Sequence, residues 1–425
     1  MNSYQGWTAH EVNQLRELLG CKLDAFARRL SVHYRTVIRW RDGETDPTPA
    51  IWDDLDNLLM EAIRKLTPWL DPDQLIKMQR RDILKLLAGG ADISLAGVDL
   101  FLTGMLSEVS DTSLSSFENI TTALASQYNT SPPHTLVGSV LGHLEKAAAI
   151  LRSASMKSIQ RRRLESVVAD SALFASALFM HTGMLAQADA QIALAEKMAR
   201  QASNMTLLAE ILGRKASLLF YAPSPASQGR DPNDRVALLE HADEVATRYA
   251  PAIVRMATSA QLAESRAAAP DYAKGADEAL ERSAQALQQA QFEGPVGIGF
   301  CSTAGHYSDW GQDRLEGYRG DVELSLQRAS AVDTIRASLL LKENPRWRAT
   351  GLVDLAIALI AQDQPEEACD RLAEAYTIGR RLGCVTILHH VFKARFLMPP
   401  KWSSLGCVRR LDDRLGRGWA VFAAP

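Results

Sequence analysis

The side chains of this chain best suited to contact another molecule are basic residues near its N-terminus. The segment 7–41 holds seven basic residues and three acidic ones, a charge of +4: Arg16, Lys22, Arg28, Arg29, Arg35, Arg39 and Arg41 against Glu11, Glu17 and Asp24. The whole chain of 425 residues has a formal charge of -3. A guanidinium can pair with a guanine edge or with phosphate oxygens. The chain has no basic field over its whole length, so any contact with nucleic acid would have to be local.

Residue types that serve catalysis or metal binding lack the spacing that such chemistry needs. Gly294, Gly297 and Gly299 follow an expected helix, whereas a nucleotide-binding glycine loop follows a strand. His389 and His390 are adjacent, so on a helix they point about 100° apart and cannot share a metal as residues one turn apart do. The five cysteines include no Cys-x-x-Cys pair, and neither Gly-x-Ser-x-Gly nor His-Glu-x-x-His occurs. We expect no enzyme activity, metal or cofactor.

Three short helices are expected to position the basic side chains. Thr8 and Glu11 have the spacing of a capping box, which predicts a first helix beginning near Ala9 and ending at Gly20. Apolar spacing predicts a second helix before a tight turn at Ser31 and Val32, and a third helix over Tyr34–Arg41. The residues expected to face the core are Val12, Leu15, Leu18, Leu19, Leu23, Phe26, Ala27, Leu30, Val37 and Trp40. Short helices joined this tightly are typical of a helix-turn-helix.

Residues 7–66 resemble the Xre/Cro-repressor family of helix-turn-helix domains. The resemblance rests on Phe26-Ala27, Leu30, Val32, Arg35-Thr36-Val37, Trp40 and Gly43. It implies a recognition helix in the major groove of double-stranded DNA, with the preceding helix across the backbone. Carried over by position, the base-reading residues are Tyr34, Arg35 and Arg39, and the phosphate contacts are Lys22, Arg28, Arg29, His33 and Thr36. The chain departs from the family pattern at three positions. Ser31 replaces the turn glycine, His33 replaces the small polar cap of the third helix, and Arg41 replaces an acidic residue before Asp42-Gly43.

Proline-rich and polar stretches divide the chain. They lie at Asp46–Pro49, at Ser110–Pro133 and at Met398–Trp402. We therefore predict an all-α protein with a helix-turn-helix domain at 1–66, a helical connecting region at 67–133, a repeat domain at 134–398 and a tail at 399–425. In the connecting region, Leu75–Leu87 forms an apolar stripe with basic residues on its polar side, interpreted as the solvated face of a linking helix.

Recurring small and apolar residues indicate helical repeats in the third region. Ala172, Ala175, Ser176 and Phe179, followed by Ala188, Ile192 and Ala195, match the offsets of Leu352, Leu355, Ala356 and Leu359, followed by Ala368, Leu372 and Ala375. Glu264, Ala267, Ala276, Leu280 and Ser283 form a weaker copy. This spacing resembles the tetratricopeptide repeat, a helix pair whose stacked copies form an α-solenoid with an extended concave surface. Further helices are expected at His134–Ser153, Thr206–Tyr221, Asp234–Tyr249, Ile253–Ala268 and Asp321–Lys342.

The combination of head and repeats resembles actinobacterial regulators that join an Xre-type head to tetratricopeptide repeats, with support from the C-terminal segments 353–356, 366–369 and 408–415. The resemblance implies a transcriptional regulator whose repeats receive a peptide, small-molecule or protein signal. The effector residues stay unassigned. Gln160–Arg163 would suit an anionic ligand, although such a run is more often a solvent-facing one. Aromatic residues at helical spacing are expected to be core: Phe179, Phe220, Tyr221, Tyr249, Phe300, Tyr307 and Trp310.

These observations predict a sequence-specific, homodimeric DNA-binding regulator. The alternative is a protein-interaction adaptor that uses the repeat array and carries a vestigial head; a repeat protein with phosphatase activity on a response regulator is a third reading. No apolar stretch is long enough to span a membrane, and the first residues have no basic and apolar leader pattern. We therefore expect a cytoplasmic protein without membrane association.

Overall fold

The computed structural model describes residues 7–19, 21–66, 109–128, 131–221, 232–293, 310–342 and 344–416. All secondary-structure elements in these ranges are helices. The all-α prediction is therefore confirmed for the described part of the chain. The chain divides into two compact units, Met1–Ile93 and Ser94–Pro425. The apolar stripe predicted at Leu75–Leu87 lies outside the described residues. The predicted limits at 66, 133 and 398 stay predictions.

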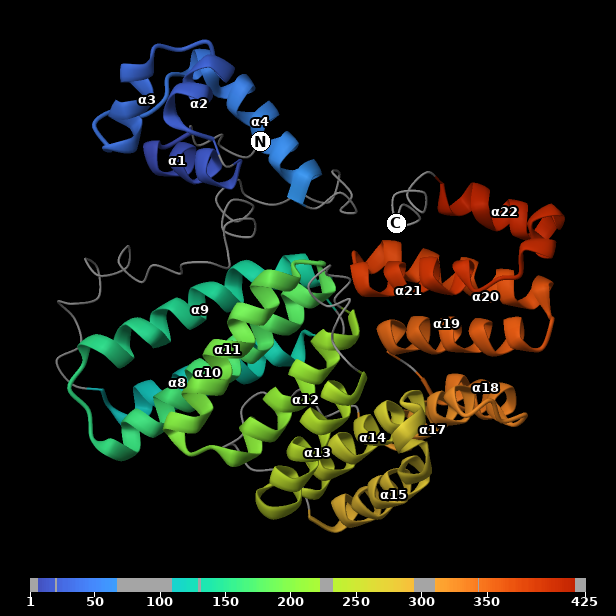
Figure 1. The fold of residues 1–425 in the computed structure, drawn as a ribbon. Coiled ribbons are helices and arrows are strands. Elements are labelled where there is room, and N and C mark those ends of the chain that lie inside the picture. The colour runs from blue at the N-terminus through green and yellow to red at the C-terminus, as the bar shows by residue number, and fades with distance from the viewer. Residues whose placement is uncertain are drawn as a thin grey trace. The chain divides into compact units, whose positions relative to one another are not determined.

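The described part of the first unit contains four α-helices. They are α1 (Ala9–Leu18), α2 (Leu23–Arg29), α3 (Tyr34–Arg41) and α4 (Trp52–Leu66), with a short 3-10 helix η1 (Pro49–Ile51) before α4 (Figure 1). The predicted capping box is present: the Glu11 amide donates to Thr8 Oγ1 at 3.3 Å, and the Thr8 amide donates to Glu11 Oε2 at 2.9 Å. The predicted start of α1 and both limits of α3 are therefore confirmed.

A small apolar core holds these helices together. It contains most of the residues expected to face inward, among them Val12, Leu15, Phe26, Ala27, Leu30, Val37 and Trp40. Trp7 is buried as well, and its indole Nε1 donates to Asp56 Oδ1 on α4 at 2.9 Å. Ser31 has a left-handed φ of 52° in the turn between α2 and α3. This conformation favours glycine, which is the residue that the family pattern has at this position. The turn therefore keeps the left-handed backbone conformation although its residue is serine.

The second unit is a succession of antiparallel helices (Figure 1). Its elements in the described ranges are α8 (Asp111–Ser126), α9 (Pro133–Ser153), α10 (Ser158–His181), α11 (Leu185–Ala202), α12 (Met205–Tyr221), α13 (Pro232–Tyr249), α14 (Ala252–Ala268), η3 (Pro270–Gly275), α15 (Ala276–Glu293), α17 (Gln312–Ser325), α18 (Ala331–Leu341), α19 (Pro345–Ala361), α20 (Pro365–Leu382), α21 (Val385–Phe396), η4 (Pro400–Ser404) and α22 (Gly406–Leu415). Of the residues predicted as a tail, η4 and α22 pack together, and α22 packs on α20.

The three predicted repeat copies correspond to three closely packed helix pairs. These pairs are α10 with α11, α14 with α15, and α19 with α20. The small residues of the pattern lie in the contacts: Ala172, Ala188, Ala276, Ser283, Ala356 and Ala368 are all fully buried. Small side chains allow two helix backbones to approach closely, which explains why alanine recurs at these offsets.

Two expectations for the second unit are wrong. The segment 321–342, expected as one helix, is broken between α17 and α18, where Gln327 has a left-handed φ of 55°. The break folds α18 back so that Ile335 packs against Gly320. Tyr249, expected in the core, is 57% exposed because it ends α13 beyond the buried Val245 and Ala246. Phe179 and Trp310 are buried as expected. The side chains of Phe220 and Tyr221, and residues Phe300 and Tyr307, lie outside the described residues.

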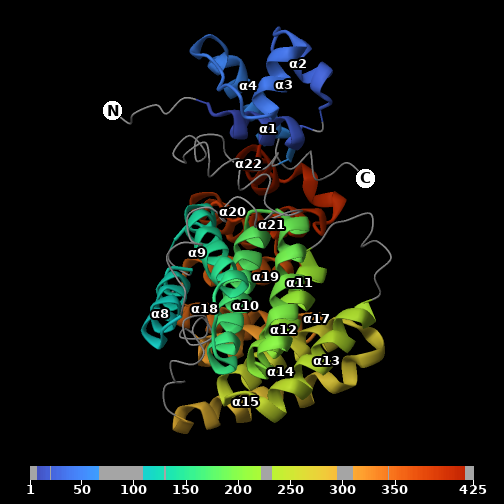
Figure 2. The ribbon, with the colours of Figure 1, turned by 90° about the vertical axis from the view of Figure 1, so that its left-hand side faces the viewer.

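Early and late helices of the second unit meet. α10 contacts α21 (Figure 2), and His181 Nδ1 lies 2.9 Å from Thr386 Oγ1 across this contact. Tyr128, after α8, places its hydroxyl 2.6 Å from His181 Nε2 on the other side of the ring. Its own ring lies beneath the Arg346 guanidinium of α19 at 4.5 Å. The helices from α10 to α21 thus form a path along the chain, and its first and last helices meet through the buried contact of His181 with Thr386.

The long helix α10 lies in the middle of this arrangement. Among the described helices, one segment, Ser158–His181, is long and apolar enough to cross a membrane. However, 94% of its most apolar window is buried by neighbouring helices. Its apolar residues therefore have protein partners, which is the property of a core helix.

Candidate nucleic-acid interface

The predicted DNA-contacting residues gather on α2, α3 and the turn that joins them. Tyr34 is 45% exposed at the start of α3, and Arg35 and Arg39 are also exposed, whereas Val37 and Trp40 on the opposite side of this helix are buried. Lys22, Arg28, Arg29 and His33 are exposed, and Thr36 is half-buried. Burial of one face of α3 against α1 and α2 leaves the polar face with Arg35 in solvent.

The arginines of this surface differ in the partners they have. Arg28 pairs with Asp24 at 3.1 Å, Arg39 Nε lies 3.5 Å from Glu44 Oε2, and Arg29 pairs with Glu61 of α4. Arg35 and Lys22 have no salt bridge in the part of the chain that the structure describes. Exposed ion pairs are worth about 0–1 kcal/mol, so an approaching phosphate or base can replace Asp24 or Glu44 at low cost. Arg35 needs no such exchange.

Arg29 is held more firmly than the other predicted phosphate contacts. Hydrogen bonds to Cys21 and Glu61, together with the charge of Glu61, raise the pKa of its guanidinium. The pair joins α2 to α4, so Arg29 also has a structural role. A phosphate contact from Arg29 would be shared with or would displace Glu61.

His33 supplies the cap of α3. Its ring Nδ1 accepts a hydrogen bond from the Arg35 amide at 3.2 Å. An imidazole that accepts at Nδ1 in the neutral form carries its proton on Nε2. The departure from a small polar cap therefore leaves the helix capped and leaves an N–H donor on an exposed ring, beside the residues predicted to contact phosphate.

The acidic residues of the first unit lie mainly after α3. They follow in the loop and in α4 and are Asp42, Glu44, Asp46, Asp53, Asp54, Asp56 and Glu61. Several have structural partners: Asp46 accepts the Ala9 amide at 2.7 Å, and Asp42 pairs with Arg41 at 2.7 Å, which lowers the pKa of the Asp42 carboxyl. Among the described residues of this unit, the basic side chains are concentrated on α2 and α3, and the acidic side chains on the loop after α3 and on α4.

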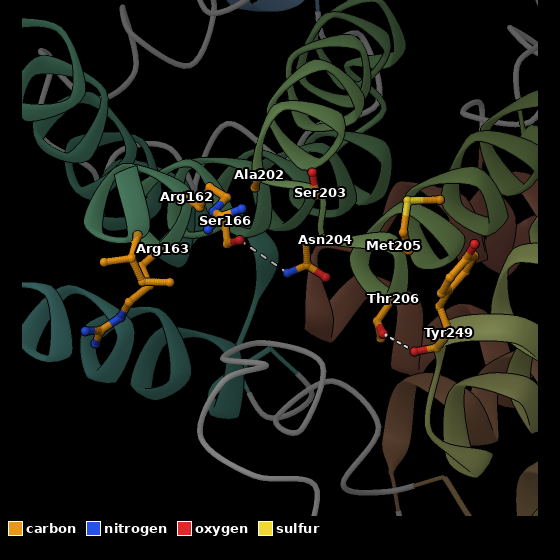
Figure 3. A pocket seen from close by; sticks show the side chains of 10 residues that line it. Arg162, Arg163, Ser166, Ala202, Ser203, Asn204, Met205, Thr206 and Tyr249 are labelled. Carbon is orange, nitrogen blue, oxygen red and sulfur yellow. Dashed lines mark hydrogen bonds between the residues drawn. The ribbon is translucent and has the colours of Figure 1, made fainter. Parts of the chain in front are cut away.

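A pocket opens in the second unit beside the arginine run 161–163 (Figure 3). Its volume is 460 Å³, and its walls come from the first half of α10, the turn between α11 and α12, and the end of α13. The residues of the run Gln160–Arg163 have different surroundings in the structure. Arg162 lines the pocket, whereas the guanidinium of Arg163, another lining residue, is held by Glu118 at 2.8 Å and Asp111 at 3.3 Å. Gln160 Oε1 accepts the Lys157 amide and caps α10.

Sequence reasoning missed a group of titratable side chains in the second unit. Asp321 of α17 hydrogen-bonds to Asp354 of α19, and burial raises the pKa of both carboxyls, that of Asp354 to about 7. Lys342 lies near them, and burial lowers the pKa of its ammonium. This Lys342 packs over Gly317 and Gly351, where an added Cβ would come within 3.0 Å and 2.9 Å of Nζ. Two carboxyls held together in this way, here Asp321 and Asp354, share a proton near neutral pH.

Metal ligands do not gather in the described part of the chain, where no group of three His, Cys, Asp or Glu side chains could hold an ion. Burial lowers the pKa of His390 to about 3, so both its charge and its access are restricted. The glycines at 294, 297 and 299 lie outside the described residues.

No protein-family model matches the sequence, and no curated protein matches it.

Proposed function

We propose that this chain is a sequence-specific DNA-binding transcriptional regulator. In this proposal residues 7–66 form a helix-turn-helix of the Xre/Cro type, with α3 as the recognition helix. The observation that carries the proposal is the exposed face of α3, where Tyr34, Arg35 and Arg39 stand over a core made by Val37 and Trp40. Arg35 has no salt bridge among the described residues, so its five donors are available to a guanine edge.

The neighbouring residues suit contacts to the DNA backbone. Lys22, Arg28, Arg29, His33 and Thr36 flank α3 on α2 and the joining turn, where they would fix orientation without reading sequence. Two heads in a homodimer would read half-sites about 34–36 Å apart, or a multiple of that distance.

The second unit would provide dimerisation, effector sensing or both. Its close helix pairs and their buried alanines support an array of the tetratricopeptide type. An effector can regulate only if it binds the DNA-competent and incompetent arrangements with different affinity. Regulation would then consist of a shift between two arrangements of the heads, in a protein that acts in the cytoplasm.

Selection of fragmented host genomic DNA on the full-length protein tests this function. We expect enrichment of an inverted repeat, which the double variant Arg35→Ala/Arg39→Ala loses. On the selected site, Arg35→Ala alone should cost about 1–3 kcal/mol of binding free energy. Arg409→Ala/Arg410→Ala removes the same charge from two exposed arginines of α22 and should leave binding unchanged.

The salt dependence of DNA affinity separates this function from an adaptor role. A DNA-binding head releases counterions and gives a steep negative slope of log affinity against log salt, which Lys22→Ala should reduce by about one. If no sequence is enriched and the slope is flat, the DNA-binding proposal fails and the repeat array is the functional part, as in an adaptor.

A further inference from the structure

The pocket beside α10 has no role in the function proposed above. Its 460 Å³ falls within the range of about 300–1,000 Å³ typical of small-molecule sites. It lies wholly in the second unit, and its lining residues come from three places in the chain (Figure 3). Two internal hydrogen bonds fix its floor, from Asn204 Nδ2 to Ser166 Oγ at 3.3 Å and from Thr206 Oγ1 to the Tyr249 carbonyl at 3.0 Å.

The charge of the lining is positive. Arg162 is exposed and has no salt bridge among the described residues, and none of the residues that line the pocket is acidic. Glu165 lies one turn further along α10, but it is buried, and burial raises the pKa of its carboxyl. The Arg163 guanidinium points away from Asn204 and Tyr249 in Figure 3 and is neutralised by Glu118 and Asp111. The charges of Arg161 and Arg162 act on the same Glu165 carboxyl and oppose the effect of its burial. Within the lining itself, Arg162 is therefore a cation without an acidic partner.

Several other residues of the lining are apolar. Ile159 is 55% exposed and Tyr249 is 57% exposed, and both line this pocket together with Met205 and Ala202. Large exposed apolar side chains that lie together often mark a binding site. A flexible methionine beside an aromatic ring can adapt to an alkyl or aryl group. Burial of an apolar group against these side chains would favour binding. A bare inorganic anion has no such group.

We propose that this pocket binds a small amphipathic anion, a molecule with one carboxylate on an apolar body. The carboxylate would pair with Arg162, and the body would lie against Ile159, Met205 and Tyr249. The proposal is independent of DNA binding, because it concerns residues of the second unit and its test contains no DNA.

Titration of the full-length protein with octanoate tests the site. The methyl groups of isoleucine and methionine would be labelled with carbon-13 and followed by NMR. We expect saturable shifts of the Ile159 and Met205 methyl signals with octanoate. Octylamine has the same apolar chain with a positive charge, and acetate has the charge without the chain, so neither should saturate the site in the same concentration range.

Two pairs of variants sharpen the test. Arg162→Gln should weaken octanoate binding about tenfold, whereas Arg161→Gln, an exposed neighbour that does not line the pocket, should leave it unchanged. Tyr249→Ala should weaken binding by a similar factor. Phe292→Ala, which removes an aromatic ring that is 88% exposed on α15, should not.

The proposal is overturned if the two methyl signals do not respond to octanoate. It is also overturned if octylamine binds as tightly, or if Arg162→Gln and Arg161→Gln behave alike. Because all four variants change exposed side chains, their folding can be checked by an unchanged methyl spectrum outside the pocket. Failure here leaves the DNA selection unaffected, so the two proposals can fail separately.

Discussion

The paired carboxyls Asp321 and Asp354 connect single residues to the pH dependence of the fold. The Asp354 carboxyl has its pKa raised by burial to about 7, so the folded state holds a proton that the unfolded chain releases near pH 4. A raised carboxyl pKa contributes stability that is fully present below the unfolded pKa and is lost as pH rises through the folded pKa. The stability that the protonated Asp354 carboxyl contributes is therefore lost as the pH rises toward and through 7.

We predict that Asp354→Asn increases the stability of the second unit relative to the wild type as pH rises from 6 to 8. The amide oxygen still accepts a hydrogen bond from the protonated Asp321 carboxyl, and the amide cannot lose a proton. The measurement is urea denaturation at pH 6, 7 and 8, compared between the two proteins. The pKa values of His143 and His390 are lowered to about 4 and about 3. Both histidines therefore destabilise the fold on the acidic side, and they contribute equally to both proteins.

Asp413→Asn is the control, because this exposed carboxyl on α22 has no salt bridge among the described residues. Its difference from the wild type should not change with pH. A constant difference for Asp354→Asn as well would show that Asp354 is ionised throughout.

At this scale the exposed arginines could be predicted from the sequence, whereas the pairing of the two carboxyls could not. Arg35 belongs to a helix whose apolar spacing already assigns Val37 and Trp40 to the core, so its exposure follows from local periodicity. Asp321 and Asp354 come together only through the packing of α17 and α19. No local spacing relates two residues on different helices.

At the scale of elements, glycine decides how closely α17 and α18 approach. A Cβ added to Gly320 would lie 2.5 Å from Ile335 Cγ1, and the Ile335 backbone is 3.5 Å away. Gly142 of α9 has no heavy atom of a neighbouring element within 4 Å of the same added atom. The two helical glycines therefore differ in packing alone.

We predict opposite effects for the same substitution at these positions. Gly320→Ala should destabilise the second unit by about 1–3 kcal/mol through overpacking against Ile335. Gly142→Ala should stabilise it by up to about 1 kcal/mol, because alanine favours the helix and meets no neighbour. The urea midpoints of the two variants, followed by circular dichroism, are expected on either side of the wild-type value. Equal midpoints would mean that α18 does not pack on Gly320.

Helix limits could be predicted where caps mark them and not elsewhere. The capping box at Thr8 marks the start of α1, and the turn at Ser31 and Val32 separates α2 from α3. The break between α17 and α18 has no glycine or proline, and its left-handed residue is Gln327. Glutamine has no preference for turns, so the sequence does not indicate a break at this position. The segment 321–342 is therefore predicted as one helix.

At the scale of the whole molecule, the contact between α10 and α21 is the feature that the repeat pattern does not contain. A repeat pattern describes how each helix meets its neighbours along the chain. His181 and Thr386 are 205 residues apart, and their approach depends on the summed rotation of every helix between them. Local spacing fixes the pairs, whereas small changes at each pair accumulate into the overall path.

The buried group at this contact should hold the two ends of the path together. Tyr128, His181, Thr386 and Cys384 are all buried, with Cys384 Sγ 3.2 Å from Thr386 Oγ1. We predict that Tyr128→Phe, which removes the 2.6 Å hydrogen bond to His181, destabilises the second unit by about 1–3 kcal/mol. The contact between α10 and α21 should also open more often, which makes Cys384 react faster with a thiol reagent.

Labelling followed by peptide mass spectrometry measures this opening, and the chain carries its own reference. Cys369 and Cys407 are buried between α20 and α22, away from His181, so their labelling rates report general unfolding. We expect Tyr128→Phe to increase the rate at Cys384 more than the rates at these two. A uniform increase at all three cysteines would mean that the second unit unfolds as a whole, and that the contact of α10 with α21 does not open separately.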